Sequence, residues 1–182
     1  MIGVAASASY FWITTQIEFI ARRRLHNEEC ATRTIEPYSR EGQNDRLLTF
    51  FEFAGMRFGD GRDDITAVYG SPEYEDGSHS SVELTYLNNA VTFFLYDDVL
   101  SIIRLTNRFA LLGGPGIAEP RAKYLGQHAN NVFDDFGPPH AISSGNYKYR
   151  FSGKSRRGFV EFTCYEHDEC LCSTIEVRWP VP

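Results

Sequence analysis

A short helical stripe of apolar residues that ends at a glycine occurs twice in the sequence. The first copy contains Gly59, Ile65, Tyr69, Gly70 and Pro72, and the second contains Gly126, Val132, Phe136, Gly137 and Pro139, at one constant displacement. In each copy the apolar residues recur at helical spacing, so one face of a short helix is apolar. Glycine commonly closes a helix in the left-handed conformation, and a proline two residues later prevents its continuation. Because helices shorter than about 12 residues are marginal in water, each must pack on another element.

Alternation of apolar and polar residues follows each stripe, and a period of two is typical of half-buried β-strands. The alternating segments lie at 82–86, 91–96 and 101–105 after the first stripe and at 147–151, 160–164 and 175–179 after the second. Asn88-Asn89 and Asp97-Asp98 separate the first three segments and are turn signals. Residues 73–81 are rich in glycine, serine and acids, which predicts a loop. Each half is therefore expected to be a helix followed by a three-stranded antiparallel meander.

The matching order of helices, glycines and strands indicates that one folding unit has been duplicated. We expect an α+β protein of two tandem modules, each a short helix followed by an antiparallel β-meander, with the two sheets side by side. The expected boundaries are an N-terminal extension at 1–46, a first module at 47–106, a connector rich in glycine and proline at 107–120 and a second module at 121–182. The first module is expected to begin with a strand at 47–53.

The N-terminal extension has three interpretations. Residues 2–21 are fairly apolar and three arginines follow them, whereas a signal peptide carries its positive charge before the apolar run. A membrane anchor needs about 20 predominantly apolar residues, and polar residues such as Gln16 and Glu18 interrupt this segment. The pattern favours the third interpretation, an amphipathic helix that docks on the protein or an extension without fixed order. Residues 26–46 are polar and are expected to form a linker.

The alternation also assigns a face to each strand residue. The side expected to pack on the helices carries Val82, Leu84, Tyr86, Val91, Phe93, Leu95, Ile103, Leu105, Tyr147, Tyr149, Phe151, Val160, Phe162, Ile175 and Val177. The opposite side carries Phe94, Tyr96, Ile102, Arg104, Lys148, Arg150, Phe159, Tyr165 and Arg178.

Aromatic rings interleaved with arginines supply rigid contact area and charge-assisted hydrogen bonds, which a protein-binding surface needs. The residues predicted to form such a surface are Phe94, Tyr96, Arg104, Arg150, Phe159, Tyr165 and Arg178. The alternative is that Phe94 and its neighbours are covered by the connector or by residues 1–40.

The sequence carries one conspicuous cluster of metal-ligating residue types, which consists of Cys164, His167, Cys170 and Cys172. A closed zinc site usually draws its ligand pairs from two separated loops, so this spacing is a weak zinc signal. Cys164 and Cys172 fall at positions that are apolar in the first half, which favours buried and unreactive thiols. A disulfide among the three cysteines is the remaining alternative. We expect no metal and no cofactor.

The net charge of −6 argues against a nucleic-acid partner, which would require a basic face. The acid pairs Asp63-Asp64, Asp97-Asp98 and Asp134-Asp135 are explained by helix starts and turns. No serine or cysteine comes with a recognisable base, so we expect a protein without enzymatic activity. The four cysteines do not resemble the disulfide framework of a secreted domain, and a cytoplasmic location is therefore expected.

In each half a helix ends in a Gly-x-Pro turn and antiparallel strands follow. This tandem arrangement resembles the β-lactamase inhibitory protein family and the outer-membrane assembly lipoproteins of the SmpA/OmlA type. The resemblance covers residues 47–180 and is carried by Phe58-Gly59, Ile65-x3-Tyr69-Gly70-x-Pro72 and Val132-x3-Phe136-Gly137-x-Pro139. It implies two modules side by side whose sheets form a concave surface that grips another protein. The sequence departs from these groups in lacking the cysteine framework of a secreted inhibitor and a lipobox cysteine near residue 20.

The leading functional hypothesis is an inhibitor- or immunity-like protein that occludes a partner enzyme or toxin with its open sheet face. The alternative is an envelope-associated scaffold that contacts the membrane through residues 2–21. A small hydrolase or metal protein built on the cysteine cluster is the third hypothesis.

Overall fold

The structure is a computed structural model that describes residues 40–78, 80–112, 119–143, 145–152, 157–165 and 170–179, with only the backbone described at 40, 41, 112 and 165. Residues 35–182 belong to one unit of the chain. The predictions made for residues 1–39, for residues 113–118 of the connector and for His167 lie outside the described residues. Within these ranges no helix is long and apolar enough to span a membrane.

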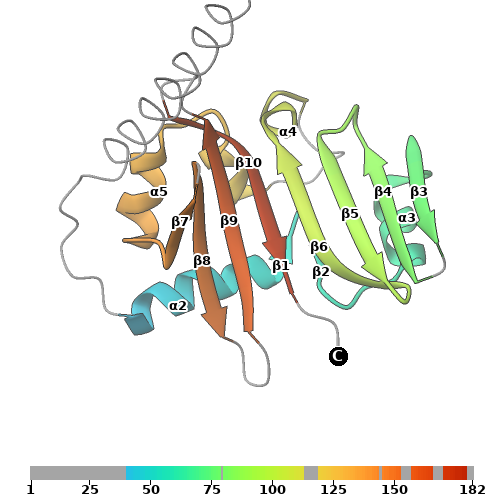
Figure 1. The fold of residues 1–182 in the computed structure, drawn as a ribbon. Coiled ribbons are helices and arrows are strands. Elements are labelled where there is room, and N and C mark those ends of the chain that lie inside the picture. Colours follow the sequence, from blue (N-terminus) through green and yellow to red (C-terminus); the bar gives the residue numbers. More distant parts are fainter. Residues whose placement is uncertain are drawn as a thin grey trace, which may run out of the picture. The chain divides into compact units, whose positions relative to one another are not determined.

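The protein has an α+β fold built on one eight-stranded antiparallel sheet (Figure 1). Its strands are β3 (Tyr74–Ser78), β4 (Ser81–Tyr86), β5 (Val91–Tyr96), β6 (Val99–Thr106), β7 (Ala141–Ser143), β8 (Asn146–Ser152), β9 (Arg157–Tyr165) and β10 (Leu171–Arg178). The sheet order is β3-β4-β5-β6-β10-β9-β8-β7, so that both strand series run from an edge to the centre. They meet where β6 pairs with β10, with Leu105 opposite Ile175 and Arg104 opposite Glu176. A separate two-stranded sheet joins β1 (Glu52–Phe53) and β2 (Met56–Arg57).

Helices pack on one face of the large sheet through aromatic rings. The helical elements are α2 (Arg40–Leu48), η1 (Thr49–Phe51), α3 (Arg62–Tyr69), α4 (Asn107–Leu112), η2 (Pro120–Tyr124) and α5 (Ala129–Phe136). Tyr69 of α3 contacts Tyr86 of β4 and Phe93 of β5, with ring centroids 5.3 and 5.0 Å apart. Phe133 of α5 contacts Tyr147 of β8 at 5.0 Å. The hydrophobic core therefore lies between the sheet and these helices.

The two helices predicted from the apolar stripes are confirmed as α3 and α5. The N–H of Gly70 donates to the carbonyl of Thr66 at 2.9 Å, and the N–H of Gly137 donates to that of Phe133 at 2.7 Å. The φ angles of these glycines are 80° and 72°. Residues with a Cβ atom rarely adopt such φ values, so the two helix ends require glycine.

All six predicted strands are present, as β4, β5, β6, β8, β9 and β10. The loop predicted at 73–81 is wrong, because Tyr74–Ser78 form β3, and the short strand β7 adds a fourth strand to the other series as well. Both strands lie at the edges of the sheet, and all their described side chains are exposed. No apolar alternation marks such strands in the sequence. For this reason each predicted meander had three strands, whereas each observed series has four.

The described part of the expected linker, residues 40–46, and the strand expected at 47–53 are also wrong. These residues form α2, η1 and the two-residue strand β1. Leu47 of α2, Phe50 of η1 and Phe53 of β1 recur every third residue and are fully buried, so all three elements contribute a side chain to the core. Gln43 anchors α2 to the end of α5, since its Nε2 donates to the carbonyl of Phe136 at 2.6 Å.

The faces assigned from the alternation agree with the burial of the side chains. Every residue expected to pack on the helices is buried, except Val82, which is half-buried. An ion pair between Glu119 and Arg121 is also largely buried. The Glu119 carboxylate accepts the N–H of Ala54 at 2.8 Å, and the Arg121 guanidinium lies 5.2 Å from the ring of Phe50. This pair fastens η2 to the segment that contains η1 and β1.

The described cysteines are all disulfide-bonded. Cys164 of β9 and Cys172 of β10 lie opposite each other, with Cα atoms 3.8 Å apart and their sulfurs joined. The prediction that they are buried is confirmed. The favoured prediction of free thiols is wrong. Residues directly opposite each other on neighbouring antiparallel strands have Cβ atoms close enough to form a disulfide. Among the described residues no group of ligand side chains is arranged to hold a metal ion.

Replacing both Cys164 and Cys172 by alanine is expected to lower the free energy of unfolding. The bond closes a loop between residues that are 8 positions apart. A loop of that length restricts the unfolded chain enough to stabilise the fold by about 2–3 kcal/mol. Denaturant titration of the variant and of the oxidised parent measures the difference. An unchanged midpoint and slope would show that this bond adds nothing to stability.

Candidate functional site

Side chains on the sheet face opposite the helices stand in rows, because the strand ladders are in register. The first row consists of Thr85, Thr92, Arg104, Glu176, Glu161 and Lys148. The second row consists of Glu83, Phe94, Ile102, Arg178, Phe159 and Arg150. Side chains directly opposite each other on antiparallel strands are close enough to interact. We call these two rows together the open face.

Glu176 is the charged centre of the open face. Its Oε2 accepts hydrogen bonds from Arg104, at 2.8 Å from Nε and 2.7 Å from Nη2, and its Oε1 accepts from Arg178. Only 10% of the Glu176 side chain is exposed, whereas the two arginine side chains are 40% and 44% exposed. One carboxylate therefore balances two guanidinium groups, and the cations present the more accessible surface.

Cations also lie over the aromatic rings of the open face. The guanidinium carbon of Arg104 is 4.9 Å from the ring centroid of Phe94, and that of Arg178 is 5.2 Å from Phe159. The Nζ of Lys148 lies 4.1 Å from the ring of Phe159 and 3.4 Å from a carboxylate oxygen of Glu161. Such contacts are each worth about 0.5–1 kcal/mol at exposed sites and hold both partners in one orientation. The open face is thus ordered before anything binds to it.

A pocket of about 320 Å³ lies beside the open face, where strands β5 and β10 end and strands β6 and β9 begin. Its walls are formed by Tyr96, Ile102, Arg157, Phe159, Arg178 and Trp179. We call this hollow the terminal pocket. Its apolar lining and two guanidinium groups distinguish it from the rest of the face.

Trp179 forms a fixed wall of the terminal pocket. Its ring stacks on Phe151 at 5.4 Å and meets Phe51 edge-on at 5.2 Å, and its backbone N–H donates to the carbonyl of Ser101 at 2.8 Å. Gly158 permits this arrangement, because a Cβ at that position would come within 2.6 Å of the Trp179 ring and 2.7 Å of Phe151. Any side chain at 158 would therefore displace the wall.

Most residues predicted to form the binding surface lie on the side of the sheet that the alternation assigned. Phe94, Arg104, Arg150, Phe159 and Arg178 belong to the open face. Tyr96 lines the terminal pocket and is 41% exposed, while the side chain of Tyr165 lies outside the described residues. Phe94 is half-buried beneath Arg104 and is not part of the interior.

Sequence reasoning missed three residues of this region. Glu176 was not singled out, although it alternates with Ile175 and Val177 and so must point to the open face. Arg157 was missed because the strand was started too late, and it shares the alternation of Phe159. Trp179 was assigned to a strand segment without a role, and no local pattern reveals its stacking on Phe151.

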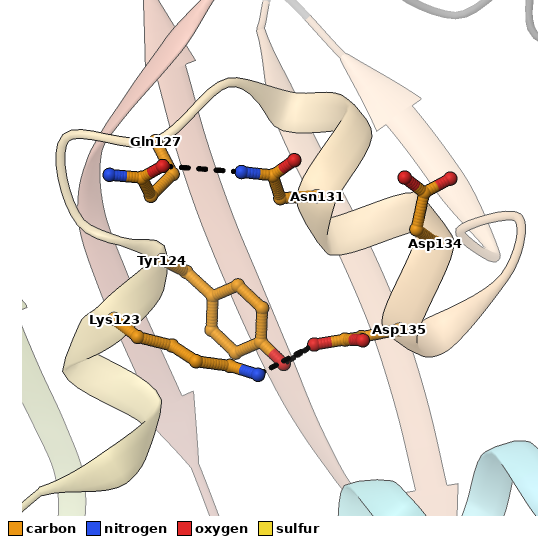
Figure 2. A pocket seen from close by; sticks show the side chains of 6 residues that line it. All are labelled: Lys123, Tyr124, Gln127, Asn131, Asp134 and Asp135. Carbon is orange, nitrogen blue, oxygen red and sulfur yellow. Dashed lines mark hydrogen bonds and ion pairs between the residues drawn. The ribbon is translucent and has the colours of Figure 1, made fainter.

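A second and more polar hollow, of about 530 Å³, lies between η2 and α5 (Figure 2). Figure 2 shows Lys123 and Tyr124 converging on Asp135, and Asn131 reaching Gln127. Lys123 Nζ lies 2.8 Å from Asp135 Oδ2, and the hydroxyl of Tyr124 donates to the same oxygen. These polar groups are paired with one another across the hollow.

The Asp135 carboxylate acts as a clamp between η2 and α5. Burial works to raise its pKa, but the hydrogen bonds from Lys123 and Tyr124 outweigh burial and hold the pKa below its ordinary value. A lowered pKa in the fold means that the clamp stabilises the protein at neutral pH and is lost as the pH falls through that value. The arrangement is explained by stability, and we place the candidate site on the open face.

No known family and no curated protein matches the sequence. Among solved structures, a cysteine-rich secretory protein from Staphylococcus aureus subsp. aureus Mu50 is similar, with 11% sequence identity and a TM-score of 0.45. The similarity covers 70% of this chain and 44% of that one, so this chain spans less than half the length of the solved protein. A TM-score below 0.5 does not establish a common fold, and the function is argued from the open face.

Proposed function

We propose that the protein binds another protein through its open face and occludes it, as an inhibitor- or immunity-like protein without catalytic activity. The observation that carries this proposal is the row of rings and cations along one side of a continuous sheet, from Phe94 to Arg150. Aromatic residues and arginine are enriched where proteins bind one another, and they supply most of the binding energy there.

Order in the free protein favours binding. Arg104 and Arg178 are each held by Glu176 and by an aromatic ring, so their side chains lose little freedom when a partner covers them. Immobilising a flexible side chain on binding costs about 0.5–1.5 kcal/mol, and side chains that are already fixed avoid most of that loss. A face of this kind suits a tight inhibitor better than a transient contact.

We also propose that the two strand series are copies of one ancestral module, related to the β-lactamase inhibitory protein family and the SmpA/OmlA type. The order of elements supports this, because α3 precedes β3–β6 and α5 precedes β7–β10, with each series running from an edge to the centre. The backbone at the helix ends agrees as well, with φ and ψ of 80° and −160° at Gly70 and of 72° and −163° at Gly137. Duplication would produce the broad sheet that a protein partner needs.

The proposal predicts that Phe159→Ala and Phe94→Ala release a partner that the parent retains. Affinity capture from the source organism with the full, oxidised chain provides the partner, and titration of that partner measures affinity. We expect each variant to weaken binding by at least about tenfold, because a hot-spot residue contributes more than about 1.4 kcal/mol.

The matched control is Val68→Ala on α3, which is 43% exposed and outside the open face. It should bind like the parent, and thermal melting should show that all three variants are folded. Unchanged affinity of the Phe94 and Phe159 variants would reject the open face as the binding surface.

A further inference from the structure

The terminal pocket carries an excess of positive charge. Among the described residues Arg157 has no carboxylate partner, and Arg178 shares the single carboxylate of Glu176 with Arg104. No acidic residue lines the pocket within the described ranges. This local excess stands out in a chain whose net charge is −6.

The size and walls of the terminal pocket restrict what can enter it. Its volume of about 320 Å³ is at the lower end of the range of about 300–1,000 Å³ for small-molecule sites, so it accommodates one or two side chains and not a large cofactor. Phe159 and Trp179 form apolar walls, and the latter is fixed by its contacts with Phe51 and Phe151. An occupant must therefore combine negative charge with an apolar part.

We propose that the terminal pocket receives an aspartate or glutamate side chain of the partner protein together with an apolar residue beside it. A guanidinium group binds a carboxylate through two parallel hydrogen bonds, and the Arg157 donors have no partner among the residues that the structure describes. The neighbouring apolar residue covers Phe159 and Trp179. This inference rests on the proposed function, because the pocket continues the open face.

Short capped peptides test the pocket without the natural partner. The probes are acetyl-Leu-Glu-Leu-amide, its glutamine analogue and its phosphoserine analogue, each titrated into the full, oxidised protein. The indole N–H signal of Trp179 reports binding by NMR and is assigned with the variant Trp179→Phe. We expect the glutamate peptide to bind at least about tenfold more tightly than the glutamine peptide, and its affinity to fall as salt is added.

Two substitutions locate the carboxylate. Arg157→Gln should reduce the affinity for the glutamate peptide to that for the glutamine peptide, and Arg157→Lys should restore part of the difference because it restores charge without the bidentate fork. Arg57→Gln is the matched control, since Arg57 lies in β2 with 62% of its side chain exposed and pairs with Glu52. It should leave both affinities unchanged.

Equal affinity for the glutamate and glutamine peptides, or an Arg157→Gln variant that binds like the parent, would overturn the inference. Tighter binding of the phosphoserine peptide would overturn it as well, because it would identify a phosphate site. These failures leave the proposed function standing if Phe159→Ala still releases the captured partner. The opposite result is also informative. If the peptides bind as expected but no captured partner depends on the open face, the proposed function is rejected, and the pocket is instead a site for free acidic peptides.

Discussion

Replacing Phe162 by alanine is expected to lower the free energy of unfolding by about 3–5 kcal/mol. The ring of Phe162 is fully buried and lies at the centre of the aromatic core. Its centroid is 6.2 Å from Phe50, 5.6 Å from Tyr124, 5.8 Å from Phe136 and 5.8 Å from Tyr149. Truncation leaves a cavity where η1, η2, α5 and β8 meet β9, and no one of these elements can move to fill it alone. Denaturant titration of the oxidised variant measures the loss.

Two further variants show whether the loss comes from the cavity. Phe162→Leu fills most of the space and should cost clearly less than Phe162→Ala. Phe159→Ala removes a ring from the same strand on the open face, where it is only half-buried, and should cost less still. A loss below about 1 kcal/mol for Phe162→Ala would contradict the central place of this ring, because core Phe truncations lie far above that value.

Replacing Glu119 by glutamine is expected to lower the free energy of unfolding by about 3–5 kcal/mol, because it leaves a charged guanidinium without its counter-charge inside the protein. Only 1% of the Glu119 side chain and 19% of the Arg121 side chain are exposed. The carboxylate also accepts the backbone N–H groups of Ala54 and Arg121, at 2.8 and 3.0 Å. The N–H of Ala54 bonds to Oε2 and that of Arg121 to Oε1, whereas an amide has one oxygen, so the variant loses one acceptor together with the charge. The decrease is again measured by denaturant titration.

An exposed ion pair provides the comparison. Glu52 pairs with Arg57 in the small sheet, and the two side chains are 61% and 62% exposed. Because exposed ion pairs add little to stability, Glu52→Gln should leave the free energy of unfolding nearly unchanged. If the Glu119 and Glu52 variants lost equal stability, burial of the Glu119–Arg121 pair would not be the source of the effect.

The sequence predicted those parts of the fold in which local pattern and burial agree. In the central strands alternate residues face opposite environments, and the alternation therefore identified both the core and the open face. At the sheet edges both faces of β3 and β7 are exposed, so no alternation exists to be found. At the junction of α2 and η1 a helical spacing was present, since Leu47 and Phe50 lie three residues apart and are both buried, but a compact apolar run resembles a strand equally well.

The candidate site was predictable only as far as its residues belong to strands. The direction of Arg104 and Arg178 follows from the period of two, whereas their joint contact with Glu176 depends on which strands become neighbours. The pairing of β6 with β10 brings together residues more than 70 positions apart, as the separation of 72 between Arg104 and Glu176 shows. No local pattern contains that information, and the terminal pocket at the same junction was missed for the same reason.

The order of strands in the sheet also determines which strand edge stays unpaired while the chain is being synthesised. β6 is complete long before β10, which follows all other described strands in the sequence and pairs with β6. Until then the nascent chain presents a strand edge with open N–H and C=O groups, the kind of edge that pairs with other chains. Neighbouring nascent chains on one polysome present the same unpaired edge of β6 once each has passed this strand. The topology therefore leaves one edge of β6 open to other chains until β10 has been synthesised and pairs with it.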